Sequence, residues 1–154
     1  MKARRIGLAA ALCFLGAVVC YAQSPFLGTW KLNAAKSKYD AGATKVETVV
    51  YEAAGENIKV TVDGTDPSGN PVHWEWTGKF DGKPYPVTGS PMADMATYRR
   101  ITSHTVAITQ TKAGKVVLRG RITVSANGKT RTVNTMQIGP KGQRIHSIAV
   151  YDKQ

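Results

Sequence analysis

The sequence predicts an all-β protein, built as one antiparallel up-and-down β-barrel of eight to ten strands. Three observations support this fold class. Apolar and polar residues alternate with a period of two almost everywhere after Ser24. Turn signals recur about every 10–14 residues between the alternating runs. No segment after Ser24 keeps a helical period over three turns, and the best short helix is the stretch 34–39.

The predicted turns are short and rich in glycine. Asp81-Gly82 and Asn127-Gly128 are dipeptides whose residues readily take the positive φ that two-residue hairpins require. Further turn signals fall at residues 55–57, 66–70, 113–114 and 140–142. Strands joined by tight turns are neighbours in space, so we expect a meander. Closing the meander into a barrel removes its two edges, and a two-sheet sandwich is the alternative.

Each strand has one face that we expect to point inward. Trp74 and Trp76 share one face of their strand, whereas His73 and Glu75 share the other. The same alternation separates apolar from polar or cationic side chains at residues 58–62, 105–109 and 116–124. A slip of one residue would turn the cations into the core, so the strand register is well specified.

Two connections are longer than tight turns, at residues 33–44 and 83–94. The second contains Pro84, Pro86 and Pro91, which cannot donate ladder hydrogen bonds. Long loops in a compact barrel are often mouth or lid segments, and an ordinary surface loop is the alternative.

The N-terminus has the layout of a secretory signal peptide. A basic stretch at residues 2–5 precedes the apolar run Ile6–Val19, and a small-residue site ends at Ala22. We therefore expect residues 1–22 to be a signal peptide and residues 23–154 to be a single domain, periplasmic or secreted. A membrane anchor is one alternative, and a lipoprotein acylated at Cys20 is another.

Cysteine usage and charge narrow the function classes. Cys13 and Cys20 both lie in the predicted signal peptide, so the processed chain would have no thiol for disulfides, catalysis or metal binding. The full chain has a net charge of +11. Removal of Lys2, Arg4 and Arg5 leaves 18 basic and 10 acidic residues, or +8. The cations are scattered along the sequence, which favours a role in solubility, with contact to an anionic envelope surface as the alternative.

Two short segments carry a resemblance to a known group of barrels. The segment 26–32, with Gly28-Thr29-Trp30 at its centre, resembles the first strand of the calycins, which include lipocalins, fatty-acid-binding proteins and avidins. The segment 149–153 is similar to the last strand of fatty-acid-binding proteins. Taken whole, the chain most resembles exported bacterial lipocalin-like domain proteins. This resemblance implies a calycin-type barrel with Trp30 packed across its closed end.

The chain also departs from the fatty-acid-binding proteins. They carry an arginine two residues before the tyrosine of the last strand, and the pair helps to hold a carboxylate. Here Tyr151 is present, but the matching position is Ala149. The connection 33–44 is too short for the two lid helices of that family. The resemblance therefore implies the barrel and not the binding of fatty acids.

Aromatic and cationic residues are the candidates for ligand binding. The tryptophans and the last-strand tyrosine would line a cavity or simply fill the core. In the cluster Tyr98-Arg99-Arg100, an inward arginine would need an anion, and two surface arginines are the alternative. The candidate ligand-binding residues are Trp30, Trp74, Trp76, Tyr98, Arg99, Arg100 and Tyr151.

Metal and catalytic chemistry have little support. His73 and Glu75 share a strand face and could begin a metal site with His104 or His146, but they face solvent if the tryptophans face inward. We expect no metal and no cofactor. No nucleophile elbow, phosphate loop or paired carboxylates are present in the sequence, so we name no catalytic residue.

Three functions remain, in order of preference. The first is a non-enzymatic protein that binds a small apolar or anionic amphipathic ligand. The second is an interaction protein that uses a basic outer surface, and the third is a barrel enzyme. A cavity above roughly 300 Å³ would favour the first and a packed interior the second. Nucleic-acid binding is disfavoured by the predicted export and by the lack of a basic-aromatic stripe. We expect no transmembrane segment after residue 22.

Overall fold

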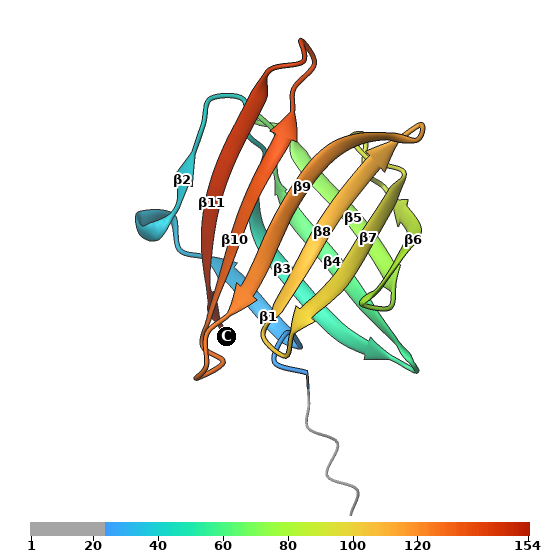
Figure 1. Ribbon diagram of the computed structural model, residues 1–154. Helices are drawn as coiled ribbons and strands as arrows, with labels where there is room; N and C mark the ends of the chain where they lie inside the picture. Colours follow the sequence, from blue (N-terminus) through green and yellow to red (C-terminus); the bar gives the residue numbers. More distant parts are fainter. Residues whose placement is uncertain (1–23) are drawn as a thin grey trace, which may run out of the picture.

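The computed structural model describes residues 24–154, which form a β-barrel (Figure 1). The predicted signal peptide lies outside the described residues. A short 3₁₀ turn, η1 (Ala34–Lys36), follows the first strand. The strands are β1 (Gly28–Leu32), β2 (Lys38–Tyr39), β3 (Lys45–Ala54), β4 (Asn57–Thr65), β5 (Pro71–Gly78), β6 (Asp81–Thr88), β7 (Met95–Thr102), β8 (Thr105–Lys112), β9 (Lys115–Val124), β10 (Thr130–Ile138) and β11 (Arg144–Lys153).

The strands follow one another around the barrel in the order of the sequence. Each strand from β3 to β11 pairs antiparallel with the next, and β1 pairs with both β3 and β11, which closes the ring. All of the eleven strands except β2 belong to this ring, so the predicted up-and-down barrel is confirmed with ten strands. The short β2 pairs only with β11, at Tyr39 and Lys38. The predicted helix 34–39 is wrong beyond Lys36, because Lys38–Tyr39 is extended.

One end of the barrel interior is filled by aromatic side chains. Trp30 and Trp76 are almost fully buried, as predicted. Their indole N–H groups are satisfied, because Trp30 Nε1 donates to the Phe26 carbonyl at 2.8 Å and Trp76 Nε1 donates to the Ala96 carbonyl at 3.2 Å. Phe26, Trp76, Phe80 and Tyr98 pack ring against ring at this closed end.

The segment from residue 83 is a strand where we expected a loop. Pro84 and Pro86 lie inside β6, which pairs with β7 along most of its length but with β5 at only two positions. Val87 N donates to the Asp94 carbonyl, on the β7 side of the strand. Consecutive residues of a strand direct their backbone N–H groups to opposite sides, so positions 84 and 86 face β5. Both are prolines, which have no N–H to donate. β6 therefore forms its ladder with β7, and it pairs with β5 at two positions only.

No helix within residues 24–154 has the length and apolar character to cross a bilayer.

Candidate functional site

The barrel interior contains a cavity of about 130 Å³. This volume is below the range of roughly 300–1,000 Å³ typical of sites for drug-sized ligands, so it does not reach the size that would favour a carrier of such ligands. It is close to the volume of about 150 Å³ with which an apolar cavity can take up one benzene molecule. The cavity therefore suits a ligand body of about one ring. Its wall is mostly apolar, with side chains that include Val60, Val62, Ile108, Ile122, Val133 and Ala149.

Arg131 lines this cavity from β10. Alternation along the strand turns it inward together with Val133, and its side chain is only 4% exposed. Arg131 Nη2 donates a hydrogen bond of 3.0 Å to the Tyr51 hydroxyl. Its Nε and Nη1 atoms are buried and have no hydrogen-bond partner among residues 24–154. None of the ion pairs within these residues includes Arg131, so its charge has no carboxylate partner there.

Two tyrosine rings hold the Arg131 guanidinium in place. Its carbon lies 5.1 Å from the ring centroid of Tyr51 and 4.9 Å from that of Tyr151. Attraction between a cation and a ring face offsets part of the loss of hydration. A ring face cannot accept hydrogen bonds as an anion does, however. The guanidinium is therefore positioned in the cavity wall with donor groups left over.

Burial keeps the tyrosines of the site neutral. It raises the pKa of Tyr98, the pKa of Tyr151 and, less strongly, the pKa of Tyr39 above the ordinary value. The Tyr151 hydroxyl donates to the Val46 carbonyl at 3.0 Å, whereas the Tyr39 hydroxyl is buried without a partner among the described residues. Arg131 is the only charged side chain of residues 24–154 that lines the cavity. The cavity therefore has a net positive charge.

Polar side chains and both long connections complete the cavity wall. Thr44, from the first connection, and Ser90 and Met92, from the second, line the cavity. Thr44 Oγ1 donates to the Met92 sulfur at 3.6 Å, and Gln137 Nε2 lies 4.0 Å from the same atom. Methionine is flexible and adapts to irregular surfaces. The position of Met92 agrees with the interpretation of these connections as mouth segments.

The structure separates the predicted aromatic candidates into two groups. Trp74, Tyr98 and Tyr151 line the cavity. Trp30 and Trp76 belong instead to the packed closed end, so they position the barrel floor and are not part of the lining.

Arg99 and Arg100 do not line the cavity, and their exposure agrees with the alternative of two surface arginines. Arg99 follows the buried Tyr98 and so points outward, and it is exposed. Arg100 is also exposed and lies over the Phe80 ring at 5.4 Å, near the irregular end of β7. The inward arginine is Arg131, which was not among the predicted site residues. Its only signal was that it shares a strand face with Val133.

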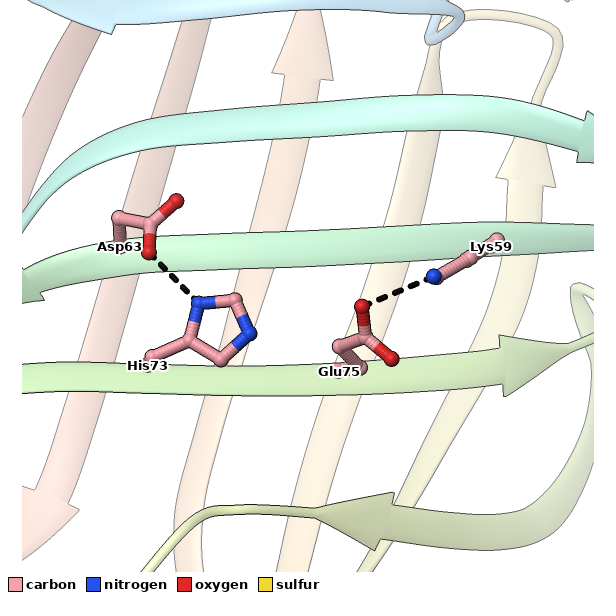
Figure 2. Close-up of polar contacts among 4 residues, drawn as sticks. All are labelled: Lys59, Asp63, His73 and Glu75. Carbon is pink, nitrogen blue, oxygen red and sulfur yellow. Dashed lines mark hydrogen bonds and ion pairs between the residues drawn. The ribbon is translucent and has the colours of Figure 1, made fainter.

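The candidate metal ligands are engaged in pairs on the outer face of β4 and β5 (Figure 2). His73 Nδ1 lies 2.6 Å from Asp63 Oδ1, and Glu75 Oε1 lies 2.8 Å from Lys59 Nζ. The His73 and Asp63 side chains are more than half exposed, whereas those of Lys59 and Glu75 are 38% and 40% exposed. Within residues 24–154 no three histidine, cysteine, aspartate or glutamate side chains gather into a metal site.

Comparison with known proteins identifies a shared fold but no family. No family model and no curated protein matches this sequence. The structure of EF1p2_mFAP2b bound to DFHBI is similar with a TM-score of 0.52 and 12% identity, over 84% of this chain and 94% of that chain. A redesigned beta barrel, mFAP1, bound to DFHBI, has a TM-score of 0.49 and 14% identity, over 84% and 95%. At such identity, the first likeness shows a common barrel fold alone.

Proposed function

We propose that this protein is exported and binds a small amphipathic molecule without transforming it. The ligand has an apolar body of about one ring, which occupies the cavity, and an anionic group, which contacts Arg131. The observation that carries this proposal is the buried Arg131 guanidinium, which has no carboxylate partner among residues 24–154.

An unpaired buried cation is expensive for a fold. Removing such a charge from water costs several kcal/mol, and buried charges are normally paired. A ligand carboxylate would supply the missing negative charge and would accept charge-assisted hydrogen bonds from the free Nε and Nη1 atoms. The buried charge destabilises the unliganded barrel, and the same charge makes the cavity bind anionic ligands more tightly than neutral ones.

The rest of the cavity supports a ligand with an apolar body. Its wall is dominated by valine, isoleucine and aromatic side chains, and its volume is about 130 Å³. The barrel of similar fold was solved bound to DFHBI, which supports ligand binding by a barrel of this kind. A long acyl chain needs more room than this cavity offers.

Equilibrium binding of two probes of matched size tests the proposal. Benzoate and toluene share one ring, and only benzoate has a negative charge. We expect 1:1 binding of benzoate, with weaker binding of toluene. Native mass spectrometry of the freshly purified protein should also reveal a co-purified small organic acid. Binding of neither probe, with no co-purified molecule, would overturn the proposal.

Export is a separate part of the proposal and has its own test. It is supported by the basic residues at 2–5, the apolar run Ile6–Val19 and the small-residue site at Ala22. We expect the protein recovered outside the cytoplasm to begin at or near Gln23 by intact mass. A cytoplasmic protein that retains residues 1–22 would contradict this part and leave ligand binding untouched.

A further inference from the structure

Charge is divided unequally between the two halves of the barrel. Residues 95–151 contain ten lysines and arginines and no aspartate or glutamate. Residues 24–94 contain seven lysines and nine acidic residues. The cations look scattered along the sequence, but the acid-free segment is one continuous half of the chain.

The fold gathers this segment on one side. Residues 95–151 supply β7 to β10 and most of β11, which are consecutive in the ring and lie side by side in Figure 1. We call their outer surface the basic face. Of the ten cations, Arg131 is buried and the other nine are exposed. They are Arg99, Arg100, Lys112, Lys115, Arg119, Arg121, Lys129, Lys141 and Arg144.

Strand register brings three arginines of the basic face close together. Arg99 on β7 and Arg121 on β9 both lie opposite Ala107 of β8, so one strand separates them. Because adjacent strands are about 4.8 Å apart, the two backbones are about 10 Å apart. Arg119 lies two residues before Arg121 on the same face. The small side chain of Ala107 leaves the arginines accessible from outside.

These cations are not neutralised within the described part of the chain. The ion pairs among residues 24–154 are Lys59–Glu75, His73–Asp63 and Lys79–Glu56, which all lie on the other half of the barrel. The basic face therefore presents a field of one sign, which attracts anionic surfaces over about a Debye length of 8 Å at physiological salt.

Apolar side chains accompany the cations. The large hydrophobic residues that are exposed within residues 24–154 are Ile101, Val116 and Ile148, at 40%, 37% and 41%, and all three belong to the acid-free segment. Ile101 lies at the end of β7, two residues after Arg99. Ile148 lies in the same cross-strand row as Arg121, with Asn134 between them.

We propose that the basic face docks on a bilayer that contains anionic phospholipids. Arginine guanidinium groups pair with lipid phosphates, and the exposed isoleucines enter the boundary between headgroups and acyl chains. A soluble polyanion would use the cations but would gain nothing from the isoleucines. The basic face also lacks the exposed aromatic side chains on which the bases of single-stranded nucleic acid stack. Lipid is therefore the partner that accounts for both features.

Co-sedimentation with vesicles tests this docking surface. The purified protein is mixed with vesicles of phosphatidylcholine alone or with about 30% phosphatidylglycerol, at low and high salt. We expect binding to the anionic vesicles at low salt only. The pure phosphatidylcholine vesicles control for insertion through residues 6–19, if the purified protein retains them.

A matched pair of double variants separates the basic face from net charge. Arg99→Gln with Arg121→Gln removes two positive charges from the basic face, and Lys45→Gln with Lys83→Gln removes two exposed charges from the other half. We expect the first to lower vesicle binding about tenfold and the second less than twofold. Ile101→Ser with Ile148→Ser should weaken binding with little change in its salt dependence. Circular dichroism confirms that each variant folds.

Three results would overturn the proposal. The first is an equal loss in both charge variants, which would mean that net charge alone matters. The second is equal binding to neutral vesicles. The third is retention on heparin or DNA without binding to vesicles, which would assign the basic face to a soluble polyanion. None of these results bears on the cavity, so ligand binding is tested independently.

Discussion

Arg131 and Tyr151 lie directly opposite each other on β10 and β11, and the guanidinium carbon is 4.9 Å from the tyrosine ring centroid. Tyr151 resembles the last-strand tyrosine of fatty-acid-binding proteins, but Ala149 occupies the position where those proteins place an arginine. In this barrel the neighbouring strand supplies a cation beside the same ring. In this barrel the cation and the tyrosine therefore lie on two neighbouring strands, whereas in fatty-acid-binding proteins both lie on the last strand.

Replacing Arg131 by methionine should stabilise the barrel and weaken the binding of an anionic ligand. Arg131→Met keeps an apolar stem of similar length and removes the unpaired charge. We expect the free energy of unfolding to rise by about 1 kcal/mol, because a buried charge without a partner opposes folding. Binding of benzoate should fall at least about tenfold, since hydrogen bonds to charged groups are worth roughly 1.5–3 kcal/mol. Urea unfolding and calorimetric titration measure the two effects.

The matched control is Arg100→Met, which removes an exposed arginine. It should leave benzoate binding unchanged. If Arg131→Met instead destabilises the barrel by several kcal/mol and spares benzoate binding, the guanidinium has a structural role and the proposed anion site is wrong.

Filling the cavity should block the ligand without opening the barrel. Ala149 lines the cavity and is buried, so Ala149→Met projects three further heavy atoms into a space of about 130 Å³. We expect affinity for any cavity ligand to fall more than about tenfold, while overpacking costs at most about 1–3 kcal/mol of stability. Val150→Met adds a larger side chain to the opposite face of the same strand and should bind as the parent does. Unchanged binding in Ala149→Met would place the ligand elsewhere.

Local alternation predicted the fold well because it reports directly on which face of a strand is buried. Trp74 and Trp76 lie inward and His73 lies outward, as that alternation required. Ten strands also lie within the predicted range. Pro84 and Pro86 were misplaced because the sequence does not say which neighbour each backbone N–H faces. These prolines are tolerated within β6 because their missing N–H groups lie on the β5 side, away from the ladder with β7.

The candidate site was less predictable, because its chemistry depends on contacts between distant segments. Arg131 is flanked by threonines, so no apolar run marked it as an inward position. Its hydroxyl partner, Tyr51, lies 80 residues away in the sequence. Arg99 and Arg100 were predicted as site residues because they are adjacent to each other and to Tyr98, but clustering in the sequence does not determine burial. The basic face was hidden for the same reason, since it exists only after the strands are placed side by side.

The buried tyrosines predict a stability loss at alkaline pH. Burial raises the pKa of Tyr98 and of Tyr151 in the folded state, with their ordinary value near 10 in the unfolded chain. Above pH 10 the unfolded chain therefore binds fewer protons than the native barrel. The stability that these two tyrosines contribute should be fully present below about pH 10 and should be lost as pH rises above it. Denaturant unfolding at several pH values, with tyrosinate absorbance in native and unfolded protein, measures this. Native tyrosines that all titrate near pH 10 would contradict the burial.

The ion pair between Asp63 and His73 should contribute little. Both side chains are more than half exposed, at 54% and 59%, and exposed pairs are typically worth less than about 1 kcal/mol. We expect Asp63→Asn to change the free energy of unfolding by less than that amount and to leave zinc affinity undetectable in both proteins. Tight zinc binding that Asp63→Asn abolishes would revive a metal site on this face.

Tyr51 and Arg131 should be strongly coupled. The Tyr51 hydroxyl accepts the hydrogen bond that Arg131 makes within residues 24–154, so Tyr51→Phe leaves the whole guanidinium without an acceptor. We expect a destabilisation of about 1–3 kcal/mol in the parent protein, which is the usual cost of a stranded buried donor. In the Arg131→Met background the same change should be nearly neutral, because there is no longer a donor to strand. A double-mutant cycle by urea unfolding measures the difference, and contacting residues typically couple by 0.5–3 kcal/mol. Additive effects would mean that the hydrogen bond does not hold the guanidinium in the cavity wall, and the anion site would lose its preorganised donor.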